Sequence, residues 1–88
     1  MFFKIAYSEN FLKHYRRLSN AEKNQFRDKL KIFIENPTRP SLRTKKITGL
    51  DNTWESSINM DIRIIWFYQD DKLIFLIDIG HHDILNNL

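Results

Sequence analysis

An arginine in the second half of the chain stands in an unusual place for a charged residue. Arg63 lies inside the otherwise aliphatic and aromatic run Ile62–Tyr68. A guanidinium is costly to bury unless it is paired, and its planar set of N–H donors suits a phosphate group. The alternative is a structural ion pair with Asp61 or Asp78. The sequence therefore predicts either an anion site or an internal ion pair at this position.

Two histidines follow the last apolar run of the chain. His81 and His82 come directly after Gly80 and precede Asp83. A histidine that titrates near neutral pH can serve as a general acid or base. The alternative is an ordinary polar surface at the end of the fold. We predict no metal site and no cofactor, because adjacent side chains point apart, and neither cysteine nor an HExxH motif is present.

The first half of the chain predicts a strand and two helices. Alternating residues indicate a strand over Phe2–Tyr7, and Ser8 can cap a short helix after it. Ser19 and Glu22 form a capping box that begins a second helix, which Pro37 ends. The apolar stripes of this helix hairpin predict burial against a sheet for a set of large side chains: Phe11, Tyr15, Phe26, Leu30 and Phe33.

The second half predicts three strands. Trp54–Ile58, Ile62–Tyr68 and Leu73–Ile79 are strand-like, and a turn at residues 69–72 makes the last two a hairpin. Strict alternation places Ile79 on the face opposite Ile74. The order β-α-α-β-β-β predicts one α+β domain over residues 1–88. In it the helix hairpin packs on one face of a small, largely antiparallel four-stranded sheet.

Composition and charge narrow the class of protein. The chain has 88 residues, 42% of them hydrophobic, with no cysteine and a net charge of +3. The lack of cysteine fits a reducing cytoplasm, and no apolar run approaches the length of a membrane span. Basic residues dominate the first half and the loop after it, where no acid interrupts a group of four: Arg39, Arg43, Lys45 and Lys46. Such a face would attract a polyanion, although ordinary solvated helix faces give the same count.

The order of motifs in residues 42–83 resembles the RelE/ParE superfamily of toxins. A basic stretch and Ile47-Thr48-Gly49-Leu50 precede Trp54, which opens a strand. Asp61-Ile62-Arg63-Ile64-Ile65 and Gly80-His81-His82-Asp83 complete the series. The last motif is similar to the His-containing RelE-like and YoeB-like members. The RelE-like fold of that superfamily agrees with the element order predicted above.

The resemblance implies a toxin of a type II toxin–antitoxin system, free as a monomer and neutralised in a hetero-oligomer by a cognate antitoxin. RelE-like members cleave mRNA on the ribosome, with no metal and by attack of the 2′-hydroxyl. ParE-like members inhibit DNA gyrase instead. A member without toxic activity would act only as a partner-binding module. All three alternatives stay open at this point, with the ribonuclease favoured.

Residue by residue, the resemblance gives Arg63 the role of stabilising the scissile phosphate and His82 that of the C-terminal catalytic group. The basic segment with Arg43, Lys45 and Lys46 would face the RNA backbone. Glu55 or His81 would supply the second proton-transfer group. The chain departs from RelE at three positions, because Glu55 and Ser57 replace two lysines and Leu88 replaces a tyrosine.

Overall fold

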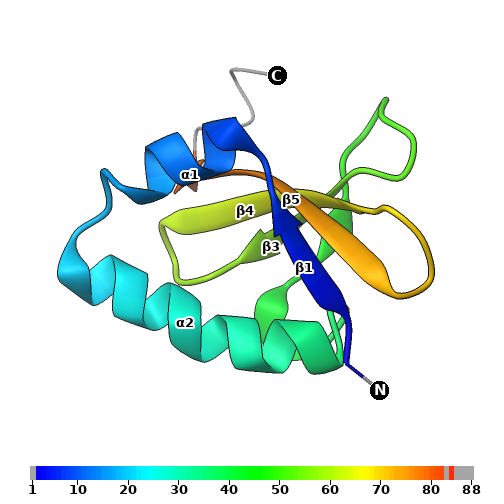
Figure 1. The fold of residues 1–88 in the computed structure, drawn as a ribbon, viewed down its shortest axis with the longest axis horizontal. Coiled ribbons are helices and arrows are strands. Elements are labelled where there is room, and N and C mark those ends of the chain that lie inside the picture. The colour runs from blue at the N-terminus through cyan, green and yellow to red at the C-terminus, as the bar shows by residue number, and fades with distance from the viewer. Residues whose placement is uncertain (1, 83, 85–88) are drawn as a thin grey trace.

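The computed structural model describes residues 2–82 and 84, which form an α+β fold (Figure 1). Its elements in chain order are β1 (Lys4–Tyr7), α1 (Glu9–Tyr15), α2 (Asn20–Glu35), the 3-10 helix η1 (Pro40–Leu42), β2 (Lys45–Lys46), β3 (Trp54–Ser57), β4 (Ile62–Tyr68) and β5 (Leu73–His81). Among the described residues, no helix is both long enough and apolar enough to cross a membrane.

The sheet has five strands in the order β1-β5-β4-β3-β2. β1 runs parallel to β5, and the other neighbouring pairs are antiparallel. The predicted α+β class is confirmed, with one strand more than predicted. The additional strand is β2, in which Lys45 pairs with Glu55 and Lys46 with Trp54. Two consecutive lysines carry no apolar alternation, so the sequence indicated only an extended segment there.

Both predicted helix starts are confirmed. The backbone N–H of Phe11 donates to Ser8 Oγ over 2.8 Å at the beginning of α1. At the beginning of α2, Glu22 N donates to Ser19 Oγ, and Ser19 N donates to Glu22 Oε1 over 2.8 Å. This reciprocal capping box satisfies two of the N–H groups that a helix start leaves without a partner. It also fixes the position of the Glu22 carboxylate.

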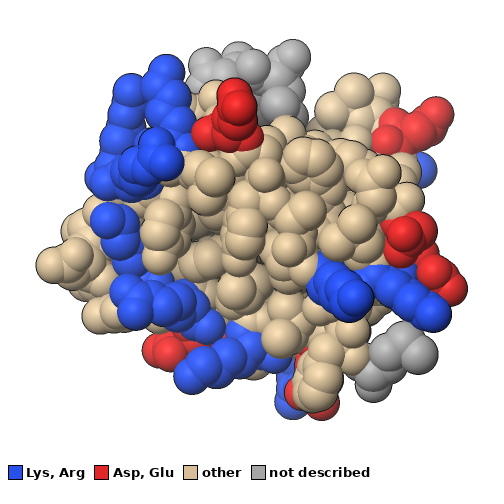
Figure 2. All heavy atoms as spheres, viewed as in Figure 1, with Lys and Arg blue, Asp and Glu red and all other residues tan. Residues whose placement is uncertain are grey.

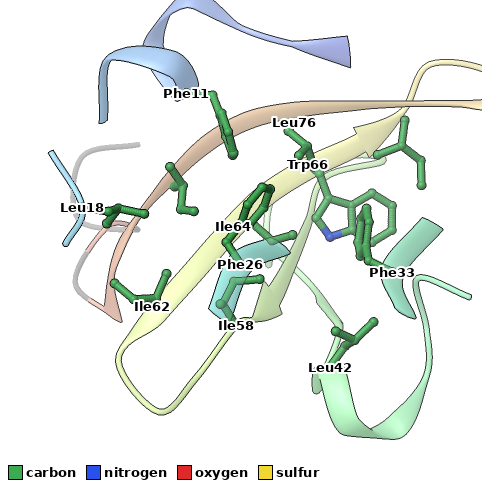
Figure 3. Packing of buried hydrophobic residues seen from close by; sticks show 12 residues of the cluster. Phe11, Leu18, Phe26, Phe33, Leu42, Ile58, Ile62, Ile64, Trp66 and Leu76 are labelled. Atoms are coloured by element: carbon green, nitrogen blue, oxygen red, sulfur yellow. The ribbon is translucent and has the colours of Figure 1, made fainter. Parts of the chain in front are cut away.

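The helix pair covers one face of the sheet, as predicted. Phe11, Phe26 and Phe33 are buried in a core with residues of β4 and β5 (Figure 3). The ring of Phe33 meets that of Trp66 edge-on, with centroids 5.0 Å apart. Tyr15 is only partly buried, and Leu30 likewise, because both lie at the margin of this core.

A β-bulge in β5 contradicts the predicted alternation of its side chains. Ile65 pairs with Asp78 and Trp66 with Leu76, which leaves Ile77 as an extra residue. An extra residue reverses which face the following side chains occupy. Ile79 consequently joins the core beneath the helices instead of the opposite face.

A chain of hydrogen bonds ties the loop before β2 to the sheet. The indole N–H of Trp66 donates to Ser56 Oγ over 2.9 Å. Ser56 Oγ lies 2.6 Å from Thr44 Oγ1, which itself donates to the carbonyl of Pro37 over 2.5 Å. Since the single hydroxyl proton of Thr44 is used, Ser56 must be the donor to Thr44. The chain places Lys45, the next residue, against β3.

Candidate functional site

Arg63 projects from β4 with its guanidinium held on one side. Nη1 donates to the carbonyls of Asn59, over 2.8 Å, and Ile62, over 3.3 Å. Nε lies 3.9 Å from Glu55 Oε1, a Coulombic contact rather than a hydrogen bond. The acid beside Arg63 is therefore Glu55, and neither Asp61 nor Asp78 pairs with it as the sequence had suggested. Within residues 2–82 and 84, no hydrogen bond from Nη2 is found, so the Nη2 edge of the guanidinium is available to donate to a ligand.

Glu55 lies between two cations. It is 5% exposed, and its Oε1 is 3.6 Å from Lys45 Nζ as well as 3.9 Å from Arg63 Nε. The strand register explains this arrangement, because Glu55 pairs with Lys45 on one side and with Ile65 on the other. Two cations and one carboxylate leave a formal charge of +1. The group can thus hold an anion while Glu55 fixes the two basic side chains.

A second group forms around Asp61, in the loop before β4. Its Oδ2 contacts His81 Nδ1, and its Oδ1 lies 3.0 Å from His82 Nδ1. Hydrogen bonds from His82 and from His81 lower the pKa of the Asp61 carboxyl to about 2, so it is ionised at neutral pH. The two imidazoles converge on one carboxylate, although we expected adjacent histidines to point apart. With Nδ1 of His82 engaged, Nε2 is the nitrogen left for a ligand.

The Arg63 group and the Asp61 group lie at the same end of the sheet. Arg63 pairs with Ser57 of β3 on one side and with Gly80 of β5 on the other. His82 follows two residues after Gly80. Lys45, Glu55 and Arg63 therefore form one cluster, and Asp61 with the two histidines forms another on the neighbouring strand ends.

Of the three predicted RNA-binding residues, Lys45 is the one that forms an ion pair in the Arg63 cluster, among the described residues. Arg43 follows η1 in the left-handed region, with φ 49°, and lines a shallow pocket with Ser57 and Met60. Lys46 is exposed, and it points to the opposite face from Lys45 because successive strand residues alternate. Lys45 is the one that approaches Arg63, through Glu55. Asp83 and Leu88 lie outside the described residues.

A second pairing of histidine with aspartate was not predicted from the sequence. His14 Nδ1 of α1 lies 2.5 Å from Asp78 Oδ1 of β5. Asp78 is 6% exposed and also accepts from Ile79 N over 2.8 Å and from Asn10 Nδ2 over 3.4 Å. An acid in an apolar strand needs such partners, so Asp78 was itself a signal that a donor would lie opposite. The role of Asp61 had a weaker signal, its place directly before the strand of Arg63.

Basic side chains gather on the helix hairpin. Figure 2 shows Lys and Arg along the side where α1 joins α2 and along α2 itself. Between the two helices lies an apolar hollow with a partly exposed lining: Tyr7, Phe11, Leu12, Tyr15, Phe26, Arg27 and Leu30. Tyr7 is 40% exposed and Leu12 39%. This surface combines positive charge with uncovered apolar area, the composition of a protein-binding site.

Solved structures of bacterial and archaeal toxins share this fold. The chain aligns with the Escherichia coli DinJ–YafQ toxin–antitoxin complex at a TM-score of 0.77 and 18% identity, over 97% of this chain and 98% of that one. With the archaeal RelE–RelB complex from Pyrococcus horikoshii the TM-score is 0.74 and the identity 19%, and the alignment covers 92% of this chain and 96% of that one. With the YoeB/ParE toxin from Agrobacterium tumefaciens the TM-score is 0.76 and the identity 13%, and the alignment covers 91% of this chain and 99% of that one. No family model matches the chain, and no curated protein does.

The fold predicted from the resemblance is therefore confirmed. It is the fold of the RelE, YoeB/ParE and YafQ toxins, and it covers nearly the whole chain. The RelE–RelB and DinJ–YafQ structures are complexes of such a toxin with an antitoxin.

Proposed function

We propose that this protein is the toxin of a type II toxin–antitoxin system and that it cleaves mRNA on the ribosome in the cytoplasm. The observation that carries the proposal is the presence of Arg63 and His82 on neighbouring strand ends, each held by its own carboxylate. RNA cleavage without a metal requires charge stabilisation and two proton transfers. A guanidinium with an unbonded edge suits the first role, and an exposed imidazole suits one of the proton transfers. The toxin fold of the solved relatives supports the same assignment.

In the proposed reaction, the 2′-oxygen of a nucleotide attacks the adjacent phosphorus and the bond to the 5′-oxygen breaks. The products are a 2′,3′-cyclic phosphate and a free 5′-hydroxyl. Arg63 stabilises the negative charge that accumulates on the phosphate oxygens, and Lys45 adds positive charge beside it. His82 gives a proton to the leaving 5′-oxygen through Nε2, while Asp61 holds Nδ1 and orients the ring.

The proton of the 2′-hydroxyl needs a second acceptor. Glu55 and His81 are the two candidates, and the contacts favour different roles for them. Glu55 is buried between Lys45 and Arg63, where it acts as a positioning residue for both cations. His81 is exposed beside Asp61, so we favour it as the acceptor that a substrate hydroxyl can reach. The ribosome would supply the remaining catalysis by holding the mRNA in a reactive geometry.

The helix hairpin is the proposed binding surface for the antitoxin. Its hollow between α1 and α2 offers apolar area around Leu12 and Tyr15, and its lining includes Arg27. The exposed Arg16 and Arg17 follow α1 in the chain. A partner segment with apolar side chains on one face and acidic ones beside them would complement both features. A Leu12→Asp variant should lose this partner in a pull-down with co-expressed antitoxin. Leu50→Asp, at an exposed leucine in the turn between β2 and β3, is the matched control and should retain it.

The test is mRNA cleavage in a purified translation system. The wild type should cut, and Arg63→Ala should reduce the rate by about 10²–10³-fold, as loss of an oxyanion donor does. Arg63→Lys should not restore full activity, because an ammonium lacks the fork of donors. Arg16→Ala, which removes an exposed arginine from the helix hairpin, is the matched control and should cut like the wild type.

The same preparations distinguish the other toxin class. If the wild type cuts no mRNA but inhibits supercoiling by DNA gyrase, the ribonuclease assignment is wrong and the ParE-like one is right. If the wild type cuts and Arg63→Ala cuts equally well, the site is wrong.

A further inference from the structure

A cluster of metal-ligating side chains lies beside His82, toward α2. It brings together Glu22 from the first turn of α2, Asp61 from the loop before β4 and His81 from the end of β5, with one ligand atom of each within 4.8 Å of the others. We propose that Glu22, Asp61 and His81 form a binding site for a divalent transition-metal ion of the Zn²⁺ type. The site shares Asp61 and His81 with the proposed RNA-cleavage site. Its test needs no RNA, so the two proposals can fail separately.

The donor set selects the kind of ion. One imidazole and two carboxylates leave a fourth position open, the arrangement of three protein ligands seen in open zinc sites. Imidazole is a ligand for Zn²⁺, Cu²⁺ and Ni²⁺, whereas Mg²⁺ and Ca²⁺ prefer oxygen alone. His82 is placed to add a fourth ligand, since its Nδ1 lies 3.0 Å from the other oxygen of Asp61.

The geometry needs little change to hold such an ion. Ligand atoms at about 2.0–2.2 Å from Zn²⁺ in a tetrahedron lie about 3.4 Å from one another. Atoms within 4.8 Å of one another thus have to approach by on the order of 1 Å. The Asp61 side chain is 51% exposed and that of His81 56%, so rotation about their side-chain bonds can supply the movement.

Glu22 distinguishes this cluster from an ordinary ion pair of histidine with aspartate. Its Oε1 accepts from Ser19 N, so the capping box holds a second carboxylate close to that of Asp61. Two carboxylates at this separation repel each other. A divalent cation bound between them would compensate both charges.

Zn²⁺ binding to the untagged protein in chelator-free buffer is the test. Isothermal titration should show one ion per chain. Because the ligands come from three separate elements, the ion should bind the folded chain alone. At about ten times Kd it should then raise Tm by roughly 5–10 °C. Mg²⁺ at the same concentration should leave Tm unchanged.

Two substitutions assign the ligands. Glu22→Gln keeps the capping box, which accepts Glu or Gln equally, but removes a carboxylate ligand. It should weaken Zn²⁺ binding by at least about 10-fold, and His81→Ala should do the same. Glu35→Gln, at the exposed far end of the same helix, is the matched control and should bind like the wild type. The proposal is overturned if the wild type binds no Zn²⁺, or if Glu22→Gln binds it as tightly as the wild type.

Discussion

The protein contains the same pairing of histidine with aspartate in two different surroundings. His14 meets Asp78 where α1 packs on β5, and the side chain of Asp78 is only 8% exposed. His82 meets Asp61 at the open end of the sheet, where the two side chains are 73% and 51% exposed. In the enclosed pair, the Asp78 carboxylate also accepts hydrogen bonds from Asn10 and from the Ile79 N–H, and the His14 side chain is 33% exposed beside a pocket. The open pair is the more exposed of the two, and on that ground we propose His82 as the functional histidine.

The largest expected effect is on the open pair. His82→Ala should reduce the rate of mRNA cleavage by about 10²–10⁴-fold, the range for loss of a general acid or base. Its Tm should change by less than about 3 °C, because His82 is exposed. Cleavage in the purified translation system and differential scanning calorimetry measure the two quantities. A large loss of stability would mean that the open pair is structural as well.

The enclosed pair should behave in the opposite way. Asp78→Ala removes a buried carboxylate and leaves His14, Asn10 and the Ile79 N–H without their acceptor. We expect a loss of about 3 kcal/mol in the free energy of unfolding, measured by urea denaturation. His14→Ala should cost less, about 1–2 kcal/mol, because two donors to Asp78 remain.

Cleavage by these two variants sharpens the comparison. Assayed at a temperature at which they stay folded, both should cut mRNA at close to the wild-type rate. If Asp78→Ala were fully stable but inactive, the enclosed pair would be the functional one.

The sequence predicted elements whose signals are local. Ser8, Ser19 and Glu22 specify helix starts within four residues, and the apolar stripes specify which helix faces meet the sheet. β2 escaped prediction because it exists only through pairing with β3, and Lys45 carries no local sign of that partner. The bulge at Ile77 escaped for the same reason, since it depends on how β5 registers with β4.

The candidate site was predictable in its residue types and not in its pairings. Arg63 and His82 were conspicuous because each is a functional group next to an apolar strand. Glu55 pairs with Arg63 across two strands, and Asp61 meets both histidines across the β4–β5 hairpin. Such contacts depend on the register between strands. A bulge changes that register, and the spacing of residues in the sequence does not show it.

The smallest expected effect concerns Asp61, and it separates positioning from fold. Asp61→Asn keeps an oxygen that can accept from His82 Nδ1 but removes the negative charge beside the ring. Cleavage should fall by about 10-fold, less than for His82→Ala, as is typical for the partner of a functional histidine. The loss should be in kcat with KM unchanged, because Asp61 acts through His82 and does not contact the RNA. Tm should shift by less than about 3 °C, since the carboxylate is exposed. Equal losses for Asp61→Asn and His82→Ala would instead make Asp61 a catalytic group in its own right.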